Sequence, residues 1–107
     1  MHKIRLRRVW KLQDQATSSD SVACFLRKFN RPTGLAGQDV FLAVESRVPL
    51  HSVLLGEHEL LSSPDSLTLR TPAAHLLQPH NTLSITLEAA PQTDFDTLAD
   101  VWLEIDD

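Results

Sequence analysis

The sequence contains a single cysteine, Cys24, among its 107 residues. One cysteine cannot form a disulfide within the chain, so the fold has no internal disulfide framework. A chain of this length buries roughly two-thirds of its unfolded surface, which is enough for a core without such cross-links. We therefore expect residues 1–107 to form a single domain around an apolar core.

Long apolar runs are also missing. No stretch approaches the roughly 20 consecutive apolar residues that a membrane-spanning helix needs. The first ten residues, MHKIRLRRVW, carry charges throughout, whereas a secretory signal peptide has an apolar segment there. These absences predict a soluble, cytoplasmic protein that does not bind membranes.

Aromatic residues are scarce: the chain has no tyrosine and two tryptophans, Trp10 and Trp102. Sugar-binding sites usually offer an exposed aromatic ring on which the apolar face of the sugar packs. Trp10 shares the parity of apolar residues in its segment, which predicts core packing. Trp102 alternates with Val101 and Leu103 and so falls on the other face, which makes it the better candidate for a sugar platform.

The net charge of -4 is modest and argues against a nucleic-acid partner. Its distribution is uneven, because basic residues gather near the start (Lys3, Arg5, Arg7, Arg8, Lys11) and acidic residues near the end (Asp94, Asp96, Asp100, Glu104, Asp106, Asp107). We expect two solvated strands that lie near each other and pair their charges. The alternative is a basic groove for an acidic partner.

Apolar and polar residues alternate with a period of two through much of the chain, which is typical of half-buried strands. The clearest case is residues 82–88, where Leu83, Ile85 and Leu87 share one face. Polar or Gly- and Pro-rich loops separate the strands at 13–20, 30–38, 62–66 and 90–97. The expected strands are 3–12, 22–29, 39–48 (ended by Pro49), two short ones around Gly56 within 51–63, 66–71, 82–88 and 100–105. This pattern predicts an all-β fold, an antiparallel β-sandwich of about seven or eight strands.

The stretch AAHLLQPHNTLSITLE, residues 73–88, contains the only expected helical turn, at 73–78. Thr71 could act as its N-cap and Pro72 could take its first position, while Pro79 ends it. The stretch is therefore interpreted as a corner that leads into a strand.

Four side chains of this corner have expected roles. Leu76 and Leu77 should plug the open end of the sandwich. The Asn81 side chain should satisfy backbone groups of the loop. His80 should be exposed.

Four segments resemble the N-terminal sugar-binding jelly-roll domain of β-galactosidase and β-glucuronidase-type glycoside hydrolases, which belongs to the galactose-binding-domain-like group. They are FLRKFNRP (25–32), GQDVFLAVES (37–46), LTLRTPAAHLLQPHNTLSITL (67–87) and LADVWLEI (98–105). The resemblance implies a jelly roll that packs beside a catalytic barrel and carries no catalytic carboxylates itself. The chain departs from the family at Leu55-Gly56, where an Asn-Gly hairpin is common, and at His80, where glycine is usual.

Candidate catalytic and metal-binding residues form no recognisable motif. The five histidines (His2, His51, His58, His75, His80) lack the spacing of a zinc site, so we expect surface histidines and no metal or cofactor. No serine among Ser52, Ser62 and Ser63 lies in a nucleophile motif, and Cys24 should pack as a small apolar residue. The carboxylate pairs Glu57/Glu59 and Asp94/Asp96 are expected to be solvated loop charges.

We therefore expect a non-catalytic β-sandwich module with no catalytic residues, whose ligand residues the sequence does not identify. Carbohydrate is one candidate ligand, as the resemblance suggests. The alternatives are a structural or protein interaction module and an accessory domain of a larger glycoside hydrolase.

Overall fold

The computed structural model describes residues 2–13, 22–35, 37–61, 65–90 and 93–106. Its strands and helical segments are β1 (His2–Arg5), β2 (Lys11–Leu12), β3 (Ala23–Asn30), β4 (Asp39–Leu55), β5 (His58–Glu59), β6 (Ser66–Pro72), the 3₁₀ turn η2 (Ala74–Leu76), β7 (His80–Leu87), the helix α1 (Phe95–Leu98) and β8 (Ala99–Asp106). The expected all-β class and strand number are confirmed.

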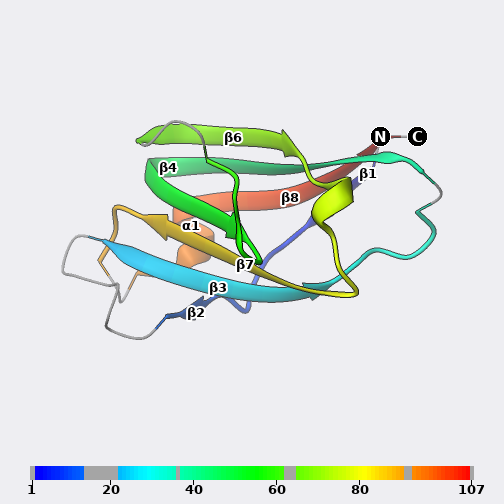
Figure 1. Ribbon diagram of the computed structural model, residues 1–107. Coiled ribbons are helices and arrows are strands. Elements are labelled where there is room, and N and C mark those ends of the chain that lie inside the picture. The colour runs from blue at the N-terminus through cyan, green and yellow to red at the C-terminus, as the bar shows by residue number, and fades with distance from the viewer. Residues whose placement is uncertain (1, 14–21, 36, 62–64, 91–92, 107) are drawn as a thin grey trace.

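The strands form one strongly curled antiparallel sheet that folds into two facing layers (Figure 1). One layer has the order β6, the first half of β4, β8 and β1, and the other has β5, the second half of β4, β7, β3 and β2. Apolar side chains from both layers meet between them, with Leu42, Leu50, Leu83, Ile85 and Leu103 among the most buried. The molecule is therefore an antiparallel β-sandwich.

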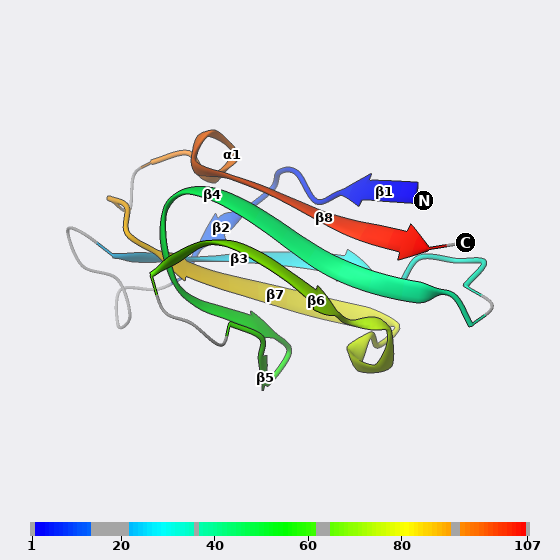
Figure 2. The same ribbon diagram turned by 90° about the horizontal axis from the view of Figure 1, so that it is seen from above.

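Strand β4 joins the two layers because it bends in the middle (Figure 2). Its residues 39–46 pair with β8, and its residues 50–55 pair with β7. The register shifts on both sides of the bend, between Glu45 and Leu50 against β6 and between Leu50 and Ser52 against β7. The expectation that Pro49 ends the strand was wrong, since a proline is tolerated at such an irregularity, where no ladder hydrogen bond is required of its nitrogen.

The N-terminal segment is not the single half-buried strand expected over residues 3–12. β1 pairs with β8 and β2 pairs with β3, which places the two strands at opposite ends of the sheet order. The residues between them cross from one layer to the other, and Leu6 is buried in the crossing, where its N–H donates to the carbonyl oxygen of Val101 at 2.8 Å. Ile4 and Leu12 share the apolar parity of Trp10 in this segment, yet each is 38% exposed because it lies on an edge strand.

An aromatic cluster closes this side of the sandwich. The rings of Trp10 and Phe95 are stacked with centroids 4.1 Å apart, and Phe25 lies 5.3 Å from Phe95. The indole nitrogen of Trp10 donates to the carbonyl oxygen of Leu6 at 3.0 Å. Trp10 thus packs against the core as expected.

Residues 90–97 were expected to be a loop, but Phe95 begins the short helix α1. Asp94 caps this helix by accepting a hydrogen bond from the N–H of Asp96.

The corner at 73–81 has the expected form with one correction. Its helical turn is η2, but Thr71 and Pro72 belong to β6, and Ala73 precedes the turn without a side-chain cap. The Asn81 side chain is buried and accepts from the N–H of Gln78 at 2.8 Å while its amide donates to the carbonyl oxygen of Gln78, also at 2.8 Å. The predicted role of Asn81 in satisfying the loop backbone is confirmed.

Leu77 is buried at this corner, and Leu76 packs partly buried against the core. Inward alternation in β7 also follows the prediction, since Asn81, Leu83, Ile85 and Leu87 are all buried. Gly56 forms the expected tight hairpin between β4 and β5 at a positive φ of 61°, a conformation that glycine adopts without strain.

Candidate functional site

The candidate sugar platform, Trp102, is not exposed. Trp102 lies on the outer face of the layer that contains β8, and only 8% of its surface is exposed. Its indole N–H donates to Glu104 at 2.9 Å, and the ammonium of Lys3 lies 5.0 Å from the centre of its ring. The expectation that Trp102 could offer a ring to a ligand was wrong, because long charged side chains of neighbouring strands cover this face.

Glu104 is the centre of this covered face. Its carboxylate accepts hydrogen bonds from the indole of Trp102 and from Arg70, whose Nε lies 3.0 Å away. The Arg70 guanidinium in turn stacks on Phe41, 4.0 Å from the ring centre. The hydrogen bonds from Trp102 and Arg70 lower the pKa of Glu104 below its ordinary value of 4.5, since both favour the charged form.

The lowered pKa predicts a pH dependence of stability. A carboxyl whose pKa is lower in the folded state contributes stability that is complete above its unfolded pKa and is lost as pH falls through the folded pKa. We expect urea unfolding to show that wild type is more stable than Glu104→Gln at pH 7, and that this difference shrinks below about pH 4.5. A difference of equal size at pH 7 and pH 3 would contradict the assignment.

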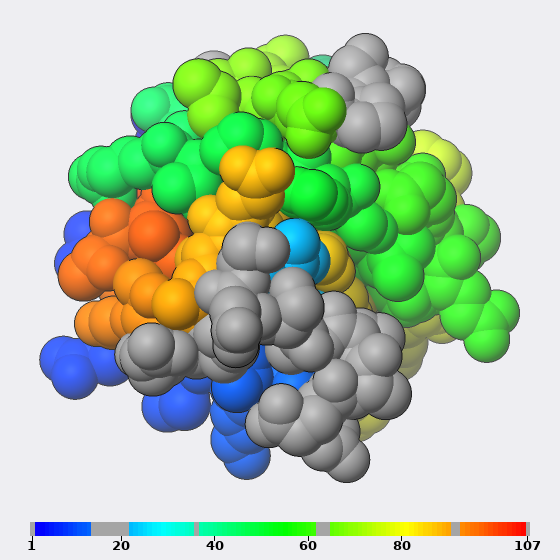
Figure 3. Space-filling model, turned by 90° about the vertical axis from the view of Figure 1, so that its left-hand side faces the viewer, coloured from blue at the N-terminus to red at the C-terminus, as the bar shows by residue number. Residues whose placement is uncertain are grey.

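The basic start and acidic end of the chain do lie together. Arg7 and Arg8 share a hollow of about 340 Å³ with Asp94, Asp96 and Asp100. Figure 3 shows the blue N-terminal segment beside the orange segment around α1. The charges of Arg7 and Arg8 thus have acidic neighbours within the molecule.

A second hollow lies along β2 and β3 and has a different character. It measures about 470 Å³, its surface is more apolar than polar, and it is lined by Val9, Lys11, Leu26, Arg27 and Lys28. Val9 is 68% exposed. Every charged side chain that lines it within the described residues is basic. This hollow therefore combines a hydrophobic surface with positive charge.

A neighbouring hollow of about 490 Å³ shares Lys28 with the second hollow. It contains His80, whose Nδ1 lies 3.0 Å from the side-chain oxygen of Asn30, and the side chain of Thr82. His80 is exposed, as predicted. Hydrogen-bonding groups thus continue the surface of the second hollow towards the corner at 73–81.

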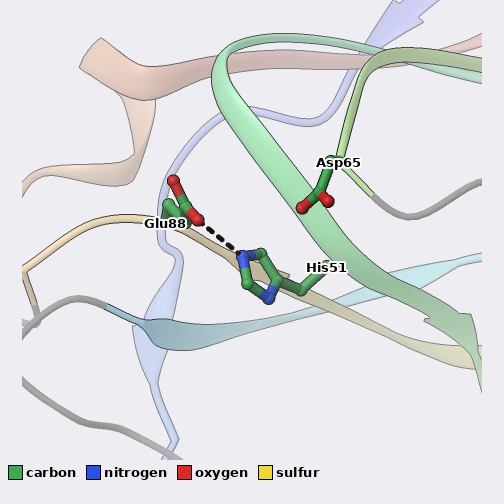
Figure 4. Close-up of side chains that lie close together, drawn as sticks. All are labelled: His51, Asp65 and Glu88. Atoms are coloured by element: carbon green, nitrogen blue, oxygen red, sulfur yellow. Dashed lines mark ion pairs between the residues drawn. The ribbon is translucent and has the colours of Figure 1, made fainter.

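His51, Asp65 and Glu88 converge at the bend of β4 (Figure 4). The Nε2 atom of His51 lies 3.3 Å from a carboxylate oxygen of Glu88. One ligand-type atom from each of the three side chains lies within 4.8 Å of the others. The set therefore offers one imidazole nitrogen and two carboxylates in a small volume.

The other residues that the sequence analysis considered as catalytic or metal-binding candidates do not come together in one site within the described residues. Cys24 is buried and contacts Gln13 through its sulfur, which fits a packing role. Glu59 is exposed and ties its own hairpin together, since it accepts from the hydroxyl of Ser52 at 2.9 Å and from the N–H of Leu61 at 3.2 Å. Glu57, His58 and His75 are exposed, and Ser62 and Ser63 lie outside the described residues.

No motif in the sequence indicates that Asp65 and Glu88 converge on His51. Their spacing along the chain matches no metal-ligand motif, and each residue comes from a different segment. Pro49 inside an apolar run was the one available hint, because a proline within a strand often marks a bulge.

The sequence matches no known protein-family model, and no curated protein matches it. The two helical segments in the described residues, η2 and α1, include none that is long and apolar enough to cross a membrane. The fold and the arrangement of side chains are therefore the basis for any functional proposal.

Proposed function

We propose that this protein is a non-catalytic β-sandwich module that binds an acidic, partly apolar segment of another protein. The observation that carries the proposal is the hollow along β2 and β3, where Lys11, Arg27 and Lys28 surround an apolar surface formed with Val9 and Leu26. Such a surface suits a segment in which carboxylates alternate with apolar side chains.

Charge supports this choice of ligand. The whole chain has a net charge of -4, so a gathering of cations on one face runs against the overall balance. Arg7 and Arg8 share their own hollow with aspartates, whereas the charged residues described around the second hollow are all basic. Electrostatic complementarity of this kind speeds association and selects partners of opposite charge.

The position of the hollow at a sheet edge supports an extended ligand. β2 is the last strand in the sheet order on this side, and no described strand pairs with its other edge. Recognition by strand addition uses such an edge for main-chain hydrogen bonds and uses neighbouring pockets for alternate side chains. An acidic segment laid beside β2 would run next to Val9 and Lys11, which are both exposed.

Arg27 gives the surface a fixed cation. Its Nε donates to the carbonyl oxygen of Arg7, and a terminal nitrogen donates to the carbonyl oxygen of Lys28 at 3.0 Å. A guanidinium held by two backbone carbonyls loses less side-chain entropy when a ligand binds. Lys11 and Lys28 supply the remaining positive charge, and both are exposed.

Carbohydrate binding is the second candidate, and it rests on the resemblance to galactose-binding-domain-like jelly rolls. The hollow with Asn30, His80 and Thr82 offers polar groups that suit sugar hydroxyls. However, Trp102 is covered and Trp10 is stacked on Phe95, so neither tryptophan offers an open ring. We therefore prefer the acidic protein segment, and we propose the jelly-roll kinship and an accessory role beside a larger hydrolase only as secondary interpretations.

Fluorescence polarisation with labelled eight-residue peptides tests the proposal. We expect saturable binding of a peptide of alternating Glu and Val, no binding of the matched Lys and Val peptide, and weakening of binding as salt is added. The double variant Lys11→Gln/Lys28→Gln should bind the acidic peptide at least tenfold more weakly.

The matched control is Arg5→Gln/Arg47→Gln, which removes the same charge from the other layer and from the bend. It should bind like wild type, and an equal loss in both double variants would show unspecific charge attraction and contradict the proposal. Binding to neutral or acidic oligosaccharides while the acidic peptide stays unbound would favour the carbohydrate candidate instead.

A further inference from the structure

We infer that His51, Asp65 and Glu88 form a zinc-binding site at the bend of β4. The inference stands apart from the peptide-binding surface, which lies along β2 and β3 and shares no residue with it. The ligands would be one imidazole nitrogen and two carboxylate oxygens, with water in the fourth position.

The distances suit a small tetrahedral ion. Zinc binds imidazole nitrogen and carboxylate oxygen at about 2.0–2.2 Å, so neighbouring ligand atoms of a tetrahedral site lie about 3.3–3.5 Å apart. The distance between Nε2 of His51 and Oε1 of Glu88 is 3.3 Å. A carboxylate oxygen of Asp65 lies within 4.8 Å of a ring nitrogen of His51 and of a carboxylate oxygen of Glu88, and the Asp65 side chain is exposed.

The backbone fixes the three residues around one point. His51 is the residue at which the register of β4 against β7 shifts, between Leu50 and Ser52, and bulges of this kind re-aim a side chain. The N–H of Asp65 donates to the carbonyl oxygen of Leu50 at 2.8 Å, and the N–H of Glu88 donates to that of Pro49 at 3.0 Å. Both carboxylate residues are therefore attached to the same short stretch of β4 that carries His51.

Charge also favours a cation here. Two carboxylates that lie so close together repel each other electrostatically. The His51 side chain is 34% exposed and that of Glu88 is 50% exposed, so an ion can enter from solvent. A divalent cation would neutralise both carboxylates at once.

The donor set selects zinc over the hard cations. Calcium takes six to eight oxygen ligands, and magnesium prefers oxygen ligands with several retained waters. Imidazole nitrogen is suited to zinc and its neighbours in the transition series. The presence of His51 among the three ligands therefore favours zinc over calcium or magnesium.

Zinc titration of the tag-free, full-length protein tests the site. After treatment with a chelator and its removal, isothermal titration calorimetry at pH 7.5 should show one zinc ion per chain, with no comparable binding of calcium or magnesium. The variants His51→Gln, Asp65→Asn and Glu88→Gln should each bind zinc at least tenfold more weakly. Asn suits position 65, where φ is 68°, because asparagine tolerates the left-handed region.

The matched controls are His58→Gln and His75→Gln, which remove exposed histidines elsewhere and should bind zinc like wild type. Metal-free circular dichroism and urea unfolding will show whether each variant is folded. If a site variant fails to fold, the wild-type imidazole resonances followed by NMR give the answer, because those of His51 should shift on zinc addition ahead of the other histidines. Unsaturable binding, or equal losses in the control variants, would overturn the inference and leave only an ion pair between His51 and Glu88.

Discussion

Replacing Leu50 with alanine is expected to lower the free energy of unfolding by about 2–5 kcal/mol. Leu50 is fully buried at the bend of β4, where it pairs with Leu87 in one layer and with Ser66 in the other. Its truncation removes apolar contacts and leaves a cavity that both layers must share, and the short-range packing of the bend gives neighbours little freedom to fill it. Urea unfolding followed by circular dichroism measures the loss.

The matched control is Leu67→Ala on β6, the same chemical change at a side chain that is 49% exposed. It should change stability by about 0.5 kcal/mol or less, as expected for a surface substitution. If the two variants lost similar amounts of unfolding free energy, Leu50 would not be a central residue of the core.

Phe95→Ala should destabilise the protein by about 3–5 kcal/mol. Phe95 is buried at the start of α1 and stacks on Trp10 while it also contacts Phe25. The three rings pack together where the N-terminal segment crosses between the layers. The alanine variant therefore loses the contacts of Phe95 with both Trp10 and Phe25. Chemical denaturation gives the free energy, and a red shift of tryptophan emission would report the loosening around Trp10.

A second substitution at the same position separates ring stacking from filled volume. Phe95→Leu keeps most of the apolar volume and loses the ring, so we expect a smaller loss than for Phe95→Ala. If Phe95→Ala left stability unchanged, α1 and the crossing segment would not be part of the cooperative core.

Alternation along the chain was enough to predict most strands. In β7 the apolar residues Leu83, Ile85 and Leu87 recur at every second position, and all three are buried. Apolar residues at every second position share one face only in an extended strand, where successive side chains point to opposite sides. The corner before β7 was equally predictable, because proline and asparagine, here Pro79 and Asn81, strongly favour turns.

The predictions that were wrong are those that depend on which strands pair with each other, because the pattern within one strand contains no information about its partners. Residues 3–12 alternate well enough for one strand, yet they divide between β1 and β2 because each half pairs with a different edge. Trp102 lies on the outward parity of β8, but Lys3 and the Glu104–Arg70 pair cover it. Burial on an outer face depends on side chains from neighbouring strands, which one strand's pattern does not contain.

The candidate sites depend on contacts between distant residues. His51 and Glu88 lie 3.3 Å apart because β4 bends at Pro49 and β7 ends beside it. The surface at Lys11 and Lys28 forms because β2 and β3 are neighbours. Nothing in the local sequence around these residues indicates either arrangement.

The sequence by itself determined the all-β class, the tight hairpin at Gly56 and the corner at residues 73–81, since short-range periodicity and turn preferences act within a few residues. Only the tertiary structure decided that β4 spans both layers, that Trp102 is covered, and that His51 meets Asp65 and Glu88. These features arise from the register of strand pairing, which is set by the joint burial of side chains far apart in the chain.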